Sequence, residues 1–221
     1  MKKWMKAGIV AALAGMALMY GGCGSDQAAS SSKSSGKKQV AVVQIMQHGS
    51  LDAANKGMID GLKEKGFGPD KVEVDQQNAQ GDQSNLKSIA SRFKSNKPDI
   101  IFGISTPATQ AVANEIKDIP IVGCAITDFE TAKLVKSNAK PETNVTGVND
   151  RGPVEKQVDM GKVFMPNAKT MGLLYCSSEV NSEIQANQAK KHAESLGLSV
   201  VERTVSSVND IQQVAESMVG Q

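Results

Sequence analysis

Val40-Ala41-Val42-Val43-Gln44-Ile45-Met46 is a short, nearly continuous apolar run, and it decides the fold class. A run of this length without polar alternation is typical of a strand buried on both faces of a sheet. Apolar residues then recur at helical spacing from Leu51 to Leu62, and Gly66 ends that pattern. A buried strand followed directly by an amphipathic helix is the unit from which parallel α/β sheets are built.

The same alternation continues along the chain and predicts an α/β protein. Further strands are expected over 72–76, 99–104, 119–126, 145–148, 170–176 and 198–205. Further helices are expected over 86–93, 107–117, 154–164, 180–196 and 207–219, with Ser207 as the cap of the last one. Because crossovers between parallel strands are right-handed, helices should cover both faces of the sheets.

The second half of the chain supplies few strands for its helices. Only two clear strands follow residue 150, together with three helices, and an isolated two-stranded sheet is marginal. The sequence stops at a helix end, where a further strand is due. We therefore expect a fragment of a longer protein, with weak or absent ligand binding of its own. The alternative is one compact domain whose later strands complete the first sheet.

The first 22 residues have the composition of an export signal. Three lysines precede an uncharged, mostly apolar stretch over 7–20, which is short for a membrane span. Gly21-Gly22-Cys23 then resembles a bacterial lipobox, although Tyr20 stands where that pattern usually has Leu. We predict a signal peptide over 1–22 and a lipidated Cys23, which would hold the protein at the extracytoplasmic face of a bacterial membrane. A plain secretory signal with an incidental cysteine is the alternative.

Residues 23–38 are expected to form a flexible tether between this anchor and a globular head. Ser, Ala, Lys and Gly dominate the segment. Such a composition offers too little apolar surface to offset the entropy of ordering the chain.

Composition and motif content exclude several classes of function. The 221 residues include 25 basic and 23 acidic side chains, a balance that excludes a dedicated nucleic-acid binder. Three cysteines exclude a disulfide-built scaffold and are too few for a four-cysteine zinc site. No G-x-x-x-x-G-K-[ST], H-E-x-x-H, C-x-x-C or G-x-S-x-G motif is present. We therefore expect no metal, no cofactor and no catalytic residue.

A series of short polar motifs resembles one known family. The motifs are Gln47-His48-Gly49-Ser50-Leu51-Asp52, Gln77-Asn78-Ala79-Gln80-Gly81-Asp82, Ser105-Thr106-Pro107-Ala108, Thr127-Asp128, Asn144-Val145-Thr146-Gly147-Val148 and Pro166-Asn167-Ala168-Lys169. With them, the chain from about Gln39 onward resembles the ABC-transporter substrate-binding lipoproteins of the tryptophan/tyrosine type.

The resemblance implies a two-lobed periplasmic-binding-protein fold of class I, with the ligand between the lobes. Lobe 1 would then span 39–150, and 151–221 would be a partial lobe 2. The implied ligand is a small molecule, an aromatic or other amino acid, and the implied partner is an ABC permease.

Strand ends select the candidate site residues, because ligands of open parallel sheets bind beyond the carboxyl ends of the strands. Ser105 and Thr106 precede Pro107 at a helix start, where free N–H groups and hydroxyls would suit an α-carboxylate. Helix capping alone would explain the same residue types. Asp128 could hold an α-ammonium by a charge-assisted bond, or it could cap a helix or face water.

The remaining candidates lie at the same kind of position. His48 would be a polar contact or a stacking partner, and Phe129 would either wall an apolar pocket or pack within its loop. The other candidates are Ser50, Leu51, Asn78, Thr127, Asn149, Asp150, Ser178, Glu179 and Asn181. Cys124 and Cys176 are expected to be small buried thiols.

The sequence leaves three functions open. The first is a receptor that closes around a solute and delivers it to a permease. The second is a surface α/β hydrolase that uses His48 and Asp128 in catalysis. The third is a sensory module that binds a ligand and signals to a partner.

Overall fold

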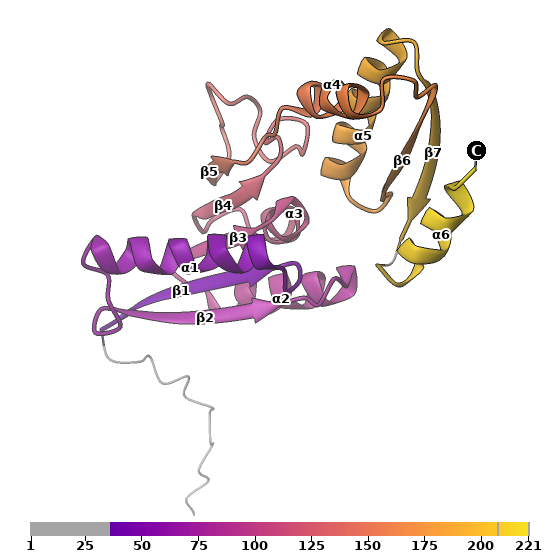
Figure 1. Ribbon diagram of the computed structural model, residues 1–221. Coiled ribbons are helices and arrows are strands. Elements are labelled where there is room, and N and C mark those ends of the chain that lie inside the picture. The colour runs from indigo at the N-terminus through magenta and orange to yellow at the C-terminus, as the bar shows by residue number, and fades with distance from the viewer. Residues whose placement is uncertain (1–35, 207, 221) are drawn as a thin grey trace, which may run out of the picture. The chain divides into compact units, whose positions relative to one another are not determined.

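The computed structural model describes residues 36–206 and 208–220 (Figure 1). This part of the chain contains one sheet of five strands and one of two, with helices between the strands. The predicted α/β class is confirmed. The predicted signal peptide, Cys23 and most of the predicted tether lie outside the described residues. No helix within the described residues is long and apolar enough to cross a membrane.

The larger sheet is parallel throughout and has the strand order β2-β1-β3-β4-β5. Its strands are β1 (Lys38–Gln44), β2 (Val72–Asn78), β3 (Ile100–Ile104), β4 (Ile121–Ile126) and β5 (Val145–Asn149). Its helices are α1 (Gly49–Glu64), α2 (Gln83–Asn96) and α3 (Thr106–Glu115). Each predicted strand and helix of this half is present, with ends that differ by a few residues.

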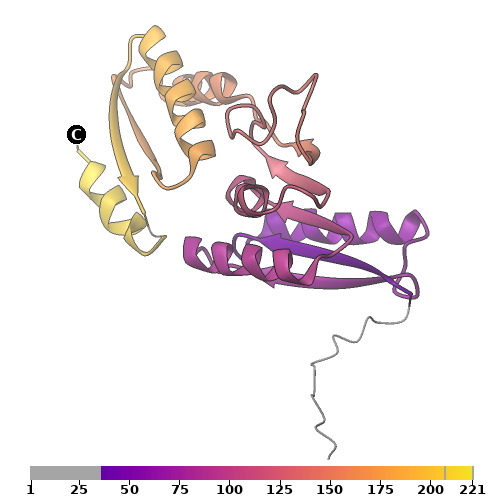
Figure 2. The ribbon, with the colours of Figure 1, turned by 180° about the vertical axis from the view of Figure 1, so that it is seen from behind.

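The side chains of β1 alternate between two apolar cores. Val40 and Val42 pack with residues of α1, whereas Ala41 and Val43 pack with residues of α2 and α3. Figure 1 shows α1 in front of the sheet, and Figure 2 shows α2 in front of it when the molecule is seen from behind. The apolar run over 40–45 is therefore buried on both faces, as predicted.

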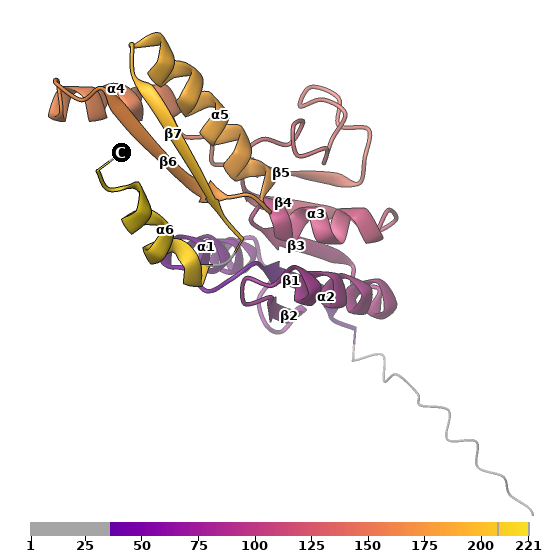
Figure 3. The same cartoon turned by 90° about the vertical axis from the view of Figure 1, so that its right-hand side faces the viewer.

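The second sheet contains two parallel strands, β6 (Thr170–Cys176) and β7 (Ser199–Val205). Helices α4 (Val154–Phe164) and α5 (Val180–Ser195) pack on it around a small core, and Figure 3 shows α5 and α6 (Ile211–Met218) on opposite sides of the strands. The later strands therefore form a sheet of their own, and the alternative in which they complete the first sheet is wrong.

The last helix differs from its prediction. A short 3-10 turn, η1 (Val208–Asp210), precedes α6, which starts at Ile211. Asp210 stands at the cap position without a side-chain cap bond. The predicted cap, Ser207, lies outside the described residues.

Gly103 lets the first turn of α3 approach β3 closely. A Cβ atom at this position would lie 2.3 Å from Oγ1 and 2.7 Å from Cα of Thr109. The Thr109 hydroxyl also donates to the carbonyl oxygen of Gly103 at 3.0 Å. The start of α3 is thereby fixed directly against the centre of the sheet.

We predict that Gly103→Ala lowers the free energy of unfolding by about 2 kcal/mol, because backbone and side-chain atoms of α3 must move to admit a methyl group. The matched control is Gly57→Ala in α1, where a Cβ atom would meet nothing within 4 Å. That change should stabilise the protein by about 0.5–1 kcal/mol through higher helix propensity. Urea unfolding measures both changes, and equal effects at the two glycines would contradict the close approach.

Candidate functional site

The strand order reverses at β1, which lies between β2 and β3. Gln44, the last residue of β1, pairs with Ile104, the last residue of β3. The connections into α1 and α3 therefore begin side by side at the carboxyl edge of the sheet. Crevices at such reversal points are the usual ligand sites of open α/β sheets.

His48 caps the amino-terminal end of α1. His48 has extended backbone angles, and its Nδ1 accepts the backbone N–H of Ser50 at 3.3 Å. The carbonyl of His48 accepts the N–H of Asp52 at 2.8 Å. Since the first four N–H groups of a helix lack intrahelical partners, the N–H groups of Gly49 and Leu51 are available at this turn.

The start of α3 is closed by Ser105. Its Oγ accepts the N–H of Ala108 at 3.4 Å, and its carbonyl accepts the N–H of Thr109 at 3.1 Å. Pro107 has no N–H to offer. Within the described residues, the N–H of Thr106 is then left without a partner at this turn.

Two residues near this edge adopt backbone conformations that are unfavourable for side chains with a Cβ atom. Ser105 has φ of 96°, and Ala125, which lies within a bulge of β4, has φ of 57°. Such conformations cost of order 1–3 kcal/mol each and persist only where the surrounding structure imposes them. At Ser105, the surroundings include a bond from its N–H to the carbonyl of Cys124 at 2.9 Å.

The two predicted threonines are bonded to each other. Oγ1 of Thr106 accepts the backbone N–H of Thr127 at 3.3 Å. Thr106 is 2% exposed and Thr127 8%. The Thr106 hydroxyl therefore joins the start of α3 to the end of β4.

Asp128 is bonded through both of its carboxylate oxygens. Oδ1 accepts the backbone N–H and the hydroxyl of Thr131 at 2.8 and 2.9 Å, and Oδ2 lies 3.4 Å from Nη1 of Arg151. The donated N–H of Thr131, followed by the Thr131 hydroxyl and the Arg151 charge, holds the pKa of Asp128 below its ordinary value, although burial opposes this shift. Asp128 therefore caps a turn over 129–133 and not a helix, since no helix lies between β4 and β5, and it also forms an ion pair that sequence reasoning missed.

Other candidates of the first sheet have local partners or face outward. Phe129 is 7% exposed and packs in the apolar core. Oδ1 of Asn78 accepts the N–H of Gln80 at 2.8 Å and so forms a turn. Asn149 and Asp150 are exposed at the end of β5.

The candidates that follow β6 form a corner rich in acceptors. Oε2 of Glu179 receives long bonds of 3.4 Å from Asn181 Nδ2 and Ser182 Oγ. Ser178 Oγ lies 3.1 Å from the sulfur of Cys176. Oδ1 of Asn181 is buried and has no hydrogen-bond partner within the described part of the chain.

Among the described residues, no three side chains of histidine, cysteine, aspartate or glutamate lie close enough together to hold a metal ion. Cys124 and Cys176 are both free and half-buried. Burial raises the pKa of the Cys124 thiol, which makes this group less reactive.

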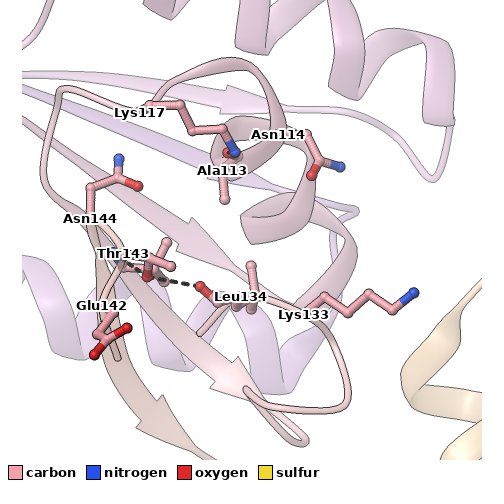
Figure 4. Close-up of a pocket in the computed structure, with 9 residues that line it drawn as sticks. Ala113, Asn114, Lys117, Lys133, Leu134, Glu142, Thr143 and Asn144 are labelled. Atoms are coloured by element: carbon pink, nitrogen blue, oxygen red, sulfur yellow. Dashed lines mark hydrogen bonds between the residues drawn. The ribbon is translucent and has the colours of Figure 1, made fainter. Parts of the chain in front are cut away.

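Several hollows flank the larger sheet, and two of them bear on the candidate site. One, of about 280 Å³, lies near the amino end of β5, and Figure 4 shows its lining residues from α3 and the loops before β5, among them Lys117, Lys133 and Glu142. No predicted site residue lines it. The other, of about 260 Å³, lies at the carboxyl ends of β1 and β2, and its lining includes Asn78 with Gln44, Asp52 and Asn55.

A family model described as ABC transporter substrate binding protein matches residues 39–221. The chain therefore belongs to this family. It is 40% identical over 219 residues to the tyrosine-binding protein of Clostridioides difficile (strain R20291), covering 96% of this chain and 63% of that protein.

Two solved structures are also similar. An ABC domain from Streptococcus pneumonia in complex with L-Trp is 42% identical, with a TM-score of 0.79, over 82% of this chain and 62% of that one. The ligand-free, open structure of a substrate-binding protein with adhesive properties from Clostridium difficile is 42% identical, with a TM-score of 0.59, over 83% and 62%. The chain thus spans less than two thirds of the length of these relatives.

We predict that Asp128→Asn lowers the free energy of unfolding by about 1 kcal/mol at neutral pH, because the charge that strengthens the bonds from Thr131 and pairs with Arg151 is lost. Since the pKa of Asp128 is lowered in the folded protein, this contribution is present above the ordinary aspartate value of about 3.9 and is lost as the pH falls through the lower folded value.

Urea unfolding at pH 7 and in acid measures the difference between Asp128→Asn and the wild-type protein. Asp150→Asn, a change at an exposed neighbour, is the control and should alter stability by less than about 0.5 kcal/mol. A difference for Asp128→Asn that stays the same in acid would contradict the assignment.

Proposed function

We propose that this protein is the extracytoplasmic solute receptor of an ABC importer and that its ligand is an aromatic amino acid. The observation that carries the proposal is the meeting of two helix starts at the strand-order reversal beside β1. Family membership and the relatives that bind tyrosine and L-Trp support it. In this proposal, 39–150 forms one lobe, and 151–221 contributes to a second lobe that closes over the ligand.

The α-carboxylate of the ligand binds at the paired helix starts. The N–H groups of Gly49, Leu51 and Thr106 are the donors left over after the caps of α1 and α3 are formed. Helix starts also carry partial positive charge, which favours an anion. Gly49 has no side chain to shield its N–H, and a Cβ atom there would meet nothing within 4 Å.

The α-ammonium and other donors of the ligand bind to acceptors. Asp128 is the first carboxylate that follows β4 in the sequence, and it is charged at neutral pH because its pKa is lowered from a value that is already well below 7. In the second lobe, Glu179 is held only by long bonds and Asn181 Oδ1 lacks a donor. A ligand N–H would satisfy that buried oxygen, which is costly to leave unpaired.

The contacts of His48 and Asp128 do not support the hydrolase hypothesis. Nδ1 of His48 accepts a backbone N–H, and Asp128 is bonded to Thr131 and Arg151. A general base needs contact with the group that it deprotonates and with an orienting acid. The matched relatives are binding proteins, and the receptor is therefore the function that we propose.

A lipid anchor is part of the proposal. Cys23 would carry the lipid after removal of 1–22, and the Ser-rich segment would separate the anchor from the head. We predict that bacteria expressing the gene incorporate labelled palmitate into the wild-type protein and none into Cys23→Ser. The variant should leave the membrane fraction, with Cys176→Ser as the control. Membrane retention of an unlabelled Cys23→Ser protein would contradict the anchor.

We predict that the full gene product binds L-tryptophan or L-tyrosine at micromolar or lower Kd in titration calorimetry. Tryptamine, which lacks the carboxylate, and 3-indolepropionate, which lacks the ammonium, should each bind at least about tenfold more weakly, since each loses a charged hydrogen-bonding group. Equal affinity for L-tryptophan and tryptamine would contradict the carboxylate site.

A pair of glycine variants tests the placement of the carboxylate. Gly49→Ala should weaken binding about tenfold without loss of stability, because its methyl group crowds the anion while the protein around it has room. Gly57→Ala, on the same helix, should change affinity by less than about twofold. An unchanged affinity in Gly49→Ala would place the carboxylate elsewhere.

A further inference from the structure

Gln44 is a polar residue at the end of an otherwise apolar strand, and it is 4% exposed. Its Nε2 donates both of its hydrogens, to the carbonyl of Met46 at 2.7 Å and to Oδ1 of Asp52 at 2.6 Å. Its Oε1 accepts Nδ2 of Asn55 at 3.3 Å. One buried amide therefore connects the end of β1, the following loop and the first two turns of α1.

Asn55 extends this network to the neighbouring strand. Its Nδ2 also donates to Oε1 of Gln76 in β2 at 3.0 Å, while its own Oδ1 is buried without a partner in the described residues. Asn55 therefore uses both donor hydrogens to hold Gln44 and Gln76 and leaves its acceptor unsatisfied. The orientation of the Gln44 amide is fixed by these bonds.

This network holds the segment over 47–51, which contains two of the N–H groups of the proposed carboxylate site. Among the described residues, Gln47–Leu51 form hydrogen bonds only with one another and with the rest of α1. The bonds from Gln44 to Met46 and Asp52 flank this segment on both sides. They fix where the N–H groups of Gly49 and Leu51 lie relative to β1.

We propose that Gln44 is a positioning residue for the ligand site, and that with Asp52 and Asn55 it holds the first turn of α1 in the orientation that receives the ligand. The inference rests on the proposed function. In this proposal Gln44 acts through α1 and does not contact the ligand. Its amide is buried, and its hydrogen-bonding atoms all have partners within the protein.

The test compares Gln44→Leu with Leu86→Ala in the full gene product. Leucine keeps the volume of Gln44 but removes both hydrogen-bond donors. Leu86 lies in α2, is fully buried and is distant in sequence from the site, so Leu86→Ala opens a cavity away from the network. Hydrogen exchange of the unliganded proteins and calorimetric titration with L-tryptophan and L-tyrosine are measured where all variants are folded.

In Gln44→Leu, the two hydrogen-bonded amides of this turn, those of Ser50 and Asp52, should exchange at least tenfold faster. Kd should rise at least tenfold with an unchanged binding stoichiometry. Leu86→Ala should lower the melting temperature while leaving the exchange of 49–52 and Kd within twofold of the wild type. Asp52→Leu should raise Kd as Gln44→Leu does. The double variant should have a Kd no higher than that of either single variant, because both changes remove the same hydrogen bond.

Unchanged exchange of the Ser50 and Asp52 amides in Gln44→Leu would overturn the proposal, and so would a Kd that rises no more than in Leu86→Ala. If the wild-type protein binds neither amino acid, the proposed function fails. The exchange comparison still decides in that case whether Gln44 orders the first turn of α1.

Discussion

The pairing of β1 with β3 is the constraint on which the rest of the larger sheet depends. Gln44 and Ile104 end these strands in register, so the chain leaves both strands at the same level and enters α1 and α3 side by side. Gly103 brings α3 onto β3, and the two faces of β1 pack against α1 and against α2 with α3. The site is thus a consequence of strand order and close packing.

Hydrogen bonds of polar side chains fix the positions of the loops and helix starts more closely than apolar packing alone. Thr106 joins α3 to the end of β4, Asp128 is bonded to Thr131 and Arg151, and Gln44 joins β1 to α1. Each of these groups is largely satisfied, as buried polar groups must be. The donors that remain belong to the backbone at the helix starts, where rigid geometry and partial positive charge suit an anion.

Local pattern was sufficient to predict the elements, because a buried apolar run and helical spacing are properties of short segments. It also placed Ser105 and Thr106 at a helix start. It did not reveal Arg151 as the partner of Asp128, nor the bonds of Gln44 to Asp52 and Asn55, since these depend on which loops meet in space. The burial of Phe129 in the apolar core likewise depends on how the sheet and its helices assemble.

In the proposed site, an amino-acid carboxylate binds the free N–H groups at the starts of α1 and α3. The most direct measurement is a crystal structure of the full gene product with L-tryptophan. In that structure the carboxylate oxygens should lie within hydrogen-bond distance, about 2.7–3.2 Å, of the backbone nitrogens of Gly49 or Leu51 and of Thr106. A carboxylate bound only by side chains, or lying away from the carboxyl ends of β1 and β3, would contradict it.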